Sequence, residues 1–318
     1  MNNGDRLLKI LDILERRTDE EHPIRTAELI ERLDREGIPT ERKTIYRCIE
    51  TLTDNGFDIV STRSPEQGYY LASRPFEKVE IRLLIDAVLA ASFVTQKKTD
   101  VLVGKLLDLV SVEQARELRS RVFIENRVKS GNEYIYYAID RISTAIEQSK
   151  KITLVYTKGE QKRHHRISPY AMAWNSDKFY LIGNMDGFDD LVHLRLDRIG
   201  DVEITEESAR PFSQVSSYKN FFDSADYVSG HINMFGGEAE TIELFCTNKG
   251  YELLLDRFEP TAKVKKEDGF YVRVKAASGQ GMVNFLALCG KEIKVLSPAS
   301  LAEKVAEHAR DILSLYEK

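Results

Sequence analysis

Several features are scarce or missing in this 318-residue chain, and each excludes a class of protein. The three cysteines, Cys48, Cys246 and Cys289, lie far apart, and none belongs to a CxxC pair. This spacing excludes a disulfide framework and favours reduced thiols packed in hydrophobic cores. No apolar run approaches the ~18 residues that a membrane span needs. The N-terminus also has no cationic and apolar signal segment, so we expect a cytoplasmic protein without a membrane partner.

Arrangements typical of catalysis or metal binding are also lacking. His164 and His165 are adjacent, so in a strand they point to opposite faces, and neither has a further His or Cys at ligand spacing. Gly279-Gln280-Gly281 lacks the remaining glycine of a phosphate loop. Local spacing gives no Ser-His-Asp or Cys-His arrangement. We therefore expect no catalytic residue, no metal, no cofactor and no enzyme.

What is present is the composition of an ordinary globular protein. Charged residues make up 31% of the chain and hydrophobic residues 42%, and the length leaves room for two or three domains. The net charge is −5. A negative chain does not coat nucleic acid in bulk, so any nucleic-acid contact must come from a local cationic patch.

The stretch from Thr26 to Leu71 has the pattern of a winged helix-turn-helix. Thr26 can cap a first helix, and Gly37-Ile38-Pro39 breaks it. Thr40 can cap a second helix that runs from Glu41 to about Asp54. Two short strands follow, Asp58–Thr62 and Gly68–Leu71, around a wing tip at Ser64–Gln67.

The second of these helices divides into two faces. Ile45, Cys48, Ile49 and Leu52 fall at i, i+3, i+4 and i+7 and form a buried stripe. The opposite face is polar and cationic, as a recognition helix requires for contact with base edges and phosphates. We expect DNA to be bound by Thr40, Arg42, Lys43, Thr44, Tyr46 and Arg47, with Arg63 beside the wing tip on the DNA backbone.

The charge of this region leaves an alternative open. Residues 1–73 hold 11 Lys and Arg against 15 Asp and Glu, a net of −4, whereas a typical DNA-binding domain is basic. Small three-helix units also serve as dimerisation or adaptor modules. The order of helix, turn, cationic helix and wing favours DNA binding. The net negative charge leaves a role in protein contacts as the alternative.

The middle of the chain changes from helices to strands. Two apolar helices are expected over Val79–Thr95 and from Val101 to about Leu118. Their apolar stripes are larger than an isolated helix can bury, which indicates a bundle core or a dimer contact. A short helix then precedes strands that predict a small, strongly bent sheet or partial barrel: Lys151–Tyr156, Gln161–Tyr170, Lys178–Gly183, Leu191–Leu196 and Asp201–Thr205.

The C-terminal part has a different pattern. Residues from Arg210 to Phe235 are irregular and read as a connection that lies across a neighbouring surface. After it, the order strand, helix, strand, strand, helix, strand and a closing helix is the split βαβ pattern of ferredoxin-like folds.

At three places the chain resembles the WYL-domain transcriptional regulators of bacteria: Pro169-Tyr170, Lys178–Leu181 and His193–Ile199. The family's Trp-Tyr-Leu appears here as Phe179-Tyr180-Leu181. The resemblance covers nearly the whole chain and implies a multidomain α+β protein. Its parts would be a winged helix-turn-helix domain (1–73), a helical linker (74–130), a WYL domain forming a small Sm-like or SH3-like β-barrel (131–210), a connection (211–237) and a C-terminal ferredoxin-like extension (238–318).

The resemblance also implies an effector site, because members of the family look like ligand-gated regulators that sense a nucleotide or single-stranded nucleic acid. Carried over by position, the pocket comprises Ser168, Tyr170, Tyr180, Arg195 and Arg198. Tyr170 stands where the family often has histidine, and it supplies no cation near neutral pH.

The residues support a site there independently. His193 and Arg195 share one face of a strand, and two arginines near aromatic groups suit phosphates and bases. The alternative is that Arg198 pairs with Asp197 or Glu203 and that Arg195 only solvates the sheet.

We therefore expect a homodimeric transcriptional regulator that binds duplex DNA through its winged helix. An anionic effector, a nucleotide or single-stranded nucleic acid, would control its DNA affinity through the WYL domain. The alternative is an accessory protein that binds single-stranded nucleic acid through the WYL domain and uses its N-terminal domain for protein contacts.

Overall fold

A computed structural model describes residues 3–63, 67–121, 128–219, 222–237 and 239–317. The protein is a mixed α/β chain with several sheets. It divides into two compact units, residues 1–130 and 131–318. Within the described residues, no helix is long and apolar enough to cross a membrane.

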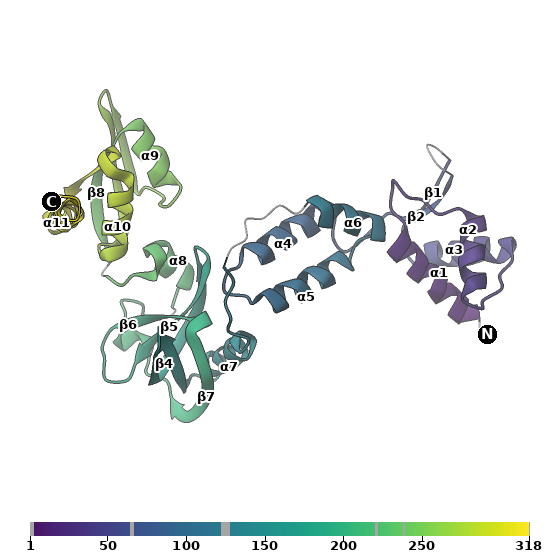
Figure 1. Ribbon diagram of the computed structural model, residues 1–318, viewed down its shortest axis with the longest axis horizontal. Helices are drawn as coiled ribbons and strands as arrows, with labels where there is room; N and C mark the ends of the chain where they lie inside the picture. Colours follow the sequence, from purple (N-terminus) through teal and green to yellow (C-terminus); the bar gives the residue numbers. More distant parts are fainter. Residues whose placement is uncertain (1–2, 64–66, 122–127, 220–221, 238, 318) are drawn as a thin grey trace. The chain divides into compact units, whose positions relative to one another are not determined.

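The first unit begins with three helices and a hairpin, in the order that the sequence predicts (Figure 1). The predicted stripe on the third helix is buried against the other two, together with Ile10, Leu14 and Leu29. The hairpin strands are antiparallel, with Thr62 opposite Gly68, and residues 64–66 of the predicted wing tip lie outside the described residues. The elements are α1 (Asn3–Arg17), α2 (Thr26–Arg35), α3 (Arg42–Asp54), β1 (Ile59–Thr62) and β2 (Gly68–Leu71).

Both predicted helix caps in this region are wrong. Thr26 is the first residue of α2 and is buried, and Arg25 precedes the helix without a side-chain cap. Thr40 lies two residues before α3, and its hydroxyl donates a hydrogen bond to the Ile38 carbonyl at 2.9 Å. The same oxygen accepts from Arg6 Nε at 3.1 Å, so Thr40 holds the turn between the helices rather than the end of α3.

The helices of the second half of this unit start and stop elsewhere than predicted. The expected helix from Val101 to Leu118 is two helices, because Ser111 interrupts it: its hydroxyl accepts from the Gln114 backbone N–H and donates to Asp19. The Thr95 hydroxyl likewise caps the N-terminal end of the helix Gln96–Leu107, because it accepts a hydrogen bond from the Lys98 backbone N–H. The elements are α4 (Lys78–Ala90), α5 (Gln96–Leu107) and α6 (Val112–Arg121), with α4 and α5 side by side (Figure 1).

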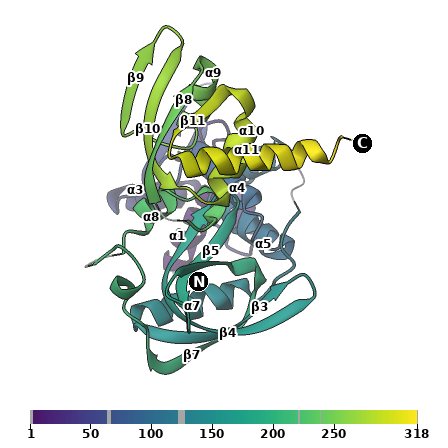
Figure 2. The same cartoon turned by 90° about the vertical axis from the view of Figure 1, so that its left-hand side faces the viewer.

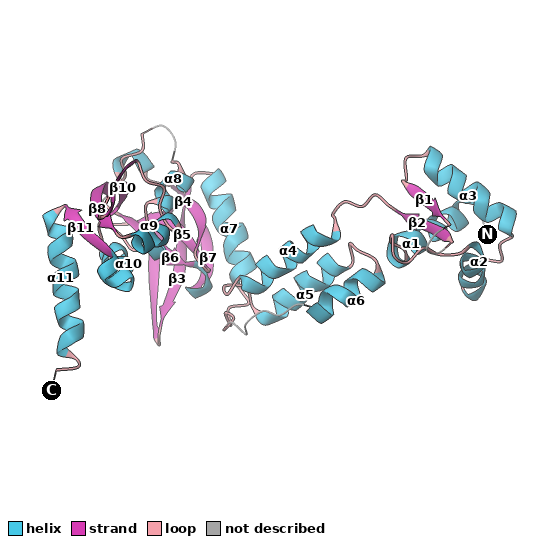
Figure 3. Ribbon diagram, turned by 90° about the horizontal axis from the view of Figure 1, so that it is seen from above, coloured by secondary structure: helices cyan, strands magenta, loops and turns pink. Residues whose placement is uncertain are grey.

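The second unit contains a five-stranded antiparallel sheet in the order β6-β5-β4-β3-β7. One face packs on the preceding helix through Ile135, Ala138 and Ile142, which are fully buried (Figure 3). The strand predicted to end at Tyr170 is longer, since β4 continues to Asn175 after a register shift between Pro169 and Ala171 in its pairing with β5. The elements are α7 (Ile135–Glu147), β3 (Lys150–Lys158), β4 (Gln161–Asn175), β5 (Lys178–Met185), β6 (Leu191–Arg195) and β7 (Ile199–Ser208).

The predicted connection crosses the other face of this sheet. It carries two 3₁₀ turns, Phe212–Gln214 and Ile232–Met234, and one short helix, α8 (Ser224–Ser229). Phe222 and Met234 of this segment are buried in one cluster with Tyr180 and Ile182 of β5. The expectation that the segment lies across a neighbouring surface is therefore confirmed.

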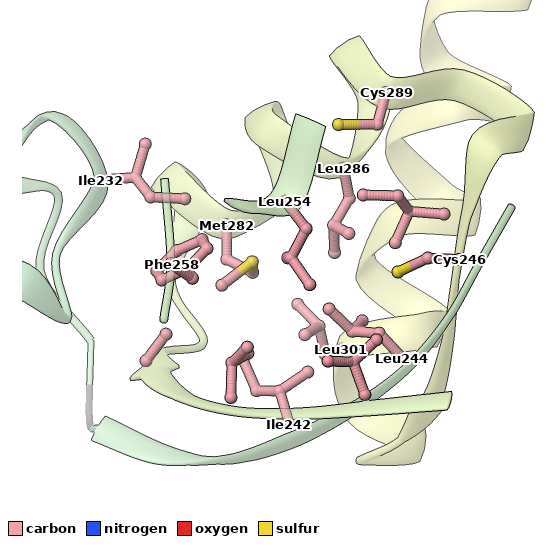
Figure 4. Close-up of a cluster of buried hydrophobic side chains, with 14 of the residues drawn as sticks. Ile232, Ile242, Leu244, Cys246, Leu254, Phe258, Met282, Leu286, Cys289 and Leu301 are labelled. Atoms are coloured by element: carbon pink, nitrogen blue, oxygen red, sulfur yellow. The ribbon is translucent and has the colours of Figure 1, made fainter. Parts of the chain in front are cut away.

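The C-terminal elements follow in the predicted order (Figure 2). Their four-stranded sheet is antiparallel in the order β11-β8-β10-β9. Cys246 and Cys289 are free thiols in its core (Figure 4), and Cys48 is a buried free thiol in the first unit. The elements are β8 (Ala239–Cys246), α9 (Asn248–Leu255), β9 (Ala262–Lys266), β10 (Gly269–Ala277), α10 (Gln280–Cys289), β11 (Ile293–Ser297) and α11 (Ala299–Ser314).

Candidate nucleic-acid and effector sites

The exposed face of α3 carries most of the residues predicted to bind DNA. Arg42, Lys43, Tyr46 and Arg47 are exposed, and Thr44 is half-buried. Among the described residues, none of the three cations forms an ion pair. Their charge is therefore available to an external anion.

Two further predicted DNA-binding residues are placed differently. Arg63 is exposed directly after β1, at the base of the hairpin loop. Thr40 is only 9% exposed, and its hydroxyl is engaged by Ile38 and Arg6. The structure thus leaves Thr40 little surface to offer DNA, because the turn before α3 uses its hydroxyl.

Tyr69 is a residue of this surface that the sequence analysis missed. It lies on β2, and its backbone pairs with Ile24 at 2.9 Å in both directions. Burial raises the pKa of its phenol, which is also affected by Tyr46 and Arg42 of α3. The phenol therefore lies close to the exposed face of α3, a proximity with no local signal in the sequence.

On the five-stranded sheet, the strand register brings three of the predicted effector residues to one face. Tyr180 on β5 pairs with Arg195 on β6, and Ile182 pairs with His193. Because side chains alternate along a strand, Tyr180, His193 and Arg195 share that face, as the sequence predicts. Phe222 and Met234 of the connection pack on this face against Tyr180 and Ile182.

Two predicted pocket residues bind the connection instead of facing an open space. The Ser168 hydroxyl is fully buried and accepts from the Arg210 backbone N–H at 2.9 Å. The Tyr170 hydroxyl donates to the Arg210 carbonyl at 2.8 Å, and its ring lies against Phe212 and Phe222. Burial raises the pKa of Tyr170 to about 12, so the phenol remains a neutral donor.

His193 is also occupied by the connection. Its Nε2 lies 2.8 Å from the hydroxyl oxygen of Tyr227, and the His231 ring lies 5.5 Å away, centroid to centroid. Burial, together with the neighbouring His231, lowers the pKa of His193 to about 4. His193 is therefore neutral at physiological pH and adds no positive charge to the face.

The charged part of the site lies at the end of β6. Arg195 donates two hydrogen bonds to Asp197, Nε to Oδ1 at 3.0 Å and a terminal nitrogen to Oδ2 at 2.6 Å. This fork excludes the expected alternative in which Asp197 pairs with Arg198. Tyr156 on β3 is a neighbour that the sequence analysis missed, and it acts electrostatically on both Tyr180 and Arg195.

Arg195 and Arg198 differ in whether an internal ion pair holds the side chain. The side chain of Arg195 is 27% exposed and held by Asp197, which raises its pKa. Arg198, in the 3₁₀ turn Leu196–Arg198, is half-buried and makes no hydrogen bond or ion pair with a described residue. Arg198 is therefore the cation of this site that an anion meets without displacing an internal partner.

No group of three His, Cys, Asp or Glu side chains in the described part of the chain is placed to hold a metal ion. His164 and His165 lie on β4, where His164 is exposed and His165 half-buried. Burial lowers the pKa of His165, and the neighbouring Arg163 adds to this effect.

Two domain families match the chain. The WYL domain matches residues 137–204, which hold most of the five-stranded sheet and most of α7. The WCX domain matches residues 238–313, which hold the C-terminal sheet and its helices. None of the curated proteins compared with the chain matches it.

The solved structures that are similar to the chain include the following two. Proteasome accessory factor B/C (PafBC) of Arthrobacter aurescens has 16% identity and a TM-score of 0.30, over 99% of this chain and 49% of that chain. A CRISPR Cas-related protein has 16% identity and a TM-score of 0.40, over 77% of this chain and 75% of that chain. This chain therefore spans about half the length of the PafBC chain.

Proposed function

We propose that this chain, a WYL-domain protein with a WCX domain at its C-terminal end, is a transcriptional regulator that binds duplex DNA. In this proposal α1–α3 and β1–β2 form a winged helix-turn-helix over residues 1–73, followed by a helical linker. The five-stranded sheet is an Sm-like or SH3-like ligand-sensing barrel, and the C-terminal sheet is a ferredoxin-like extension. The protein acts in the cytoplasm as a homodimer and catalyses no reaction.

The exposed face of α3 is the observation that carries this proposal. One side of the helix is buried by four apolar residues, and the other presents Arg42, Lys43, Tyr46 and Arg47 without internal ion pairs among the described residues. A helix divided in this way can enter the major groove with its N-terminal turns. Residues 1–73 have a net negative charge, but a DNA phosphate on this helix contacts the local cationic patch. The patch can therefore bind DNA despite the acidic composition of the region.

Replacing both Arg42 and Arg47 with Gln tests DNA binding. We expect duplex affinity to fall about tenfold or more, and the slope of log K against log salt to shrink by up to about 2. Fluorescence anisotropy with duplex from upstream of the coding sequence, across a salt series, measures both quantities.

The matched control is Arg16→Gln with Arg35→Gln, which removes the same charge from exposed arginines that pair within their own helices. This control should bind duplex like the original chain. Equal losses in both double variants would show that only net charge matters and would reject a dedicated face on α3.

For the effector, we propose an anion held at the end of β6 by Arg195 and Arg198, with Tyr156 and Tyr180 beside it. The fork to Asp197 keeps the Arg195 guanidinium in place and uses only part of its N–H donors, and the side chain is 27% exposed. Ser168, Tyr170 and His193 support the site from beneath, because the connection already satisfies their polar atoms. Binding at this site would shift the protein between two states of different DNA affinity.

Replacing Arg198 or Arg195 with Ala tests the effector site. A fluorescent single-stranded oligothymidine serves as the probe, in direct binding and as a modulator of duplex affinity. We expect each variant to lose the response to the probe and to keep basal duplex binding. Asp197→Asn, which weakens the internal fork, should bind the probe more tightly than the original chain. Loss of duplex binding and probe response together in Arg198→Ala would reject the separation of roles.

The second candidate function is an accessory protein that binds single-stranded nucleic acid and uses its N-terminal domain for protein contacts. The net charge of −4 over residues 1–73 is the observation that favours it. The same anisotropy series separates the two: binding to single strands alone, unaffected by Arg42→Gln with Arg47→Gln, would favour the accessory protein.

A further inference from the structure

A polar cleft lies beside the exposed face of α3, between this helix and the first turn of α1. The cleft encloses about 270 Å³.

 A separate cavity of about 340 Å³ lies between α4 and α5 and is lined mainly by apolar side chains such as Ile85 and Leu107. The cleft beside α3 is instead lined mostly by polar groups, among them Arg6, Thr44 and Arg47. By the ~30 Å³ that a water molecule occupies in the liquid, it has room for a phosphate group and its waters.

Arg6 lines this cleft from α1 and does not belong to the exposed face of α3. Its Nε donates to the Thr40 hydroxyl at 3.1 Å, and a terminal nitrogen lies 3.5 Å from the Pro39 carbonyl oxygen. These contacts hold the guanidinium against the start of α3, where Arg6 also lines the cleft. Arg6 is therefore positioned in advance for an anion, at little further cost in side-chain entropy.

The cleft is continuous with the exposed face of α3. Thr44 and Arg47 belong to both, since each lies on that face and also lines the cleft. Gly4 of α1 lines the opposite wall, and a Cβ atom there would meet nothing within 4 Å, so the backbone of the first turn is accessible. Asp5 is in the same turn but does not line the cleft.

We propose that this cleft binds a backbone phosphate of duplex DNA, with Arg6 and Arg47 as its cationic ligands and Thr44 as a hydroxyl donor. The inference rests on the proposed function and extends it to a contact from α1. Two guanidinium groups suit phosphate because each offers planar N–H donors. The N-terminal end of α1 adds the favourable field of its backbone dipoles. A phosphate held here would fix the depth and angle at which α3 enters the groove.

Arg6→Gln tests the proposal through the salt dependence of binding. A phosphate contact is independent of base sequence, so random duplex is a sufficient probe. We expect the slope of log K against log salt to shrink by about 0.9, with about a tenfold loss of affinity at low salt. Arg6→Lys keeps the charge and should keep most of the slope.

Thr40→Val is the matched control, because it removes the internal partner of Arg6 and leaves the guanidinium in the chain. Its slope should equal that of the original chain. A slope reduced as much in Thr40→Val as in Arg6→Gln would overturn the inference, since Arg6 would then act only by holding the turn before α3. An unchanged slope in Arg6→Gln, with the original chain binding duplex, would overturn this inference alone. Absence of duplex binding by the original chain would overturn the proposed function and this contact with it.

Discussion

At the scale of single residues, burial decides which side chains of the WYL domain carry charge. His193 lies beneath the connection against Tyr227 and His231, and burial lowers its pKa to about 4. Its neighbour Arg195 keeps its charge, since Asp197 balances the guanidinium. Arg195 therefore contributes positive charge to this face, whereas His193 serves there as a neutral packing and hydrogen-bonding group.

Because His193 is buried, we predict that the stability of the protein depends on pH, and that His193→Gln makes this dependence weaker. The folded pKa of about 4 lies below the ordinary value of 6.5, so the folded chain disfavours the proton. The stabilising contribution is fully present above pH 6.5 and is lost as the pH falls from 6.5 towards 4. At roughly 1.4 kcal/mol per pKa unit, the loss is up to about 3 kcal/mol.

Urea denaturation of both proteins at several pH values between 7 and 4 measures this contribution. We expect the free energy of unfolding of His193→Gln to vary less over this range than that of the original chain. His308→Gln is the control, because His308 lies on α11 outside the cluster beneath the connection. Parallel curves for His193→Gln and the original chain would contradict the placement of His193.

At the scale of elements, polar side chains set boundaries that hydrophobic periodicity does not reveal. Residues 101–118 have apolar spacing consistent with a single helix, yet α5 ends at Leu107 and the Ser111 hydroxyl caps the start of α6. The Ser111 hydroxyl also donates to Asp19, which lies in the loop after α1. Asp19 accepts further bonds from the backbone N–H groups of Glu21 and His22. This network joins α6 to the N-terminal helices within the first unit.

A double-mutant cycle of Asp19→Asn and Ser111→Ala tests this junction. Asp19→Asn should cost about 1–3 kcal/mol, because buried donors lose a charged acceptor. The two changes should be non-additive by about 0.5–3 kcal/mol, as expected for residues in one hydrogen-bond network. Urea denaturation measures the four proteins, and Ser120→Ala, which removes an exposed hydroxyl, is the control. Additive effects would show that the hydrogen bond does not link the two elements.

The Asp19 carboxylate also predicts how the stability of the fold changes in acid. Burial alone raises the pKa of Asp19, but hydrogen bonds from Ser111 and His22 outweigh it, and the pKa is lowered from 3.8. Asp19 therefore stabilises the fold above about pH 4 and loses this contribution as the pH falls through its folded pKa. Asp19→Asn should lose less stability than the original chain when the pH is lowered from 5 to 3, as thermal melting can measure.

At the scale of the whole molecule, the chain forms separate cores, and one long connection closes a face of the WYL sheet. Phe222 of this connection is buried against Tyr170, Tyr218 and Tyr227. The aromatic cluster makes the connection part of the domain that it covers. The Arg210 backbone N–H donates to the Ser168 hydroxyl, and the Tyr170 hydroxyl donates to the Arg210 carbonyl, so these bonds hold the start of the connection in place.

Phe222→Ala should release the connection from the sheet. Truncating a buried phenylalanine costs about 3–5 kcal/mol, and this loss should fall on the unit that contains residues 131–318. We expect faster cleavage between residues 210 and 234 in limited proteolysis, with the fragments identified by mass spectrometry. Phe188→Ala is the control, since Phe188 is 59% exposed. Equal cleavage rates in Phe222→Ala and the original chain would contradict a closing role for the cluster.

Much of the architecture was readable in the sequence because local physics specifies it. The buried stripe Ile45, Cys48, Ile49 and Leu52 follows helical spacing, and the order of the C-terminal elements follows their periodicity and turns. The shared face of Tyr180, His193 and Arg195 follows from strand alternation and pairing. The cores form where such stripes meet, so the sequence by itself determined the elements and the residues they bury.

Contacts between distant residues were decided only by the tertiary structure. Thr40 has the chemistry of a cap, but Arg6, 34 positions earlier, and Ile38 take its hydroxyl. Ser168 and Tyr170 have the chemistry of an open pocket, but Arg210 satisfies them from about 40 positions away. A hydrogen-bonding group binds whichever partner the fold brings within reach, and no local period records that partner. For this reason the sequence named the polar residues of the site, and the fold decided which of them remain free to meet a ligand.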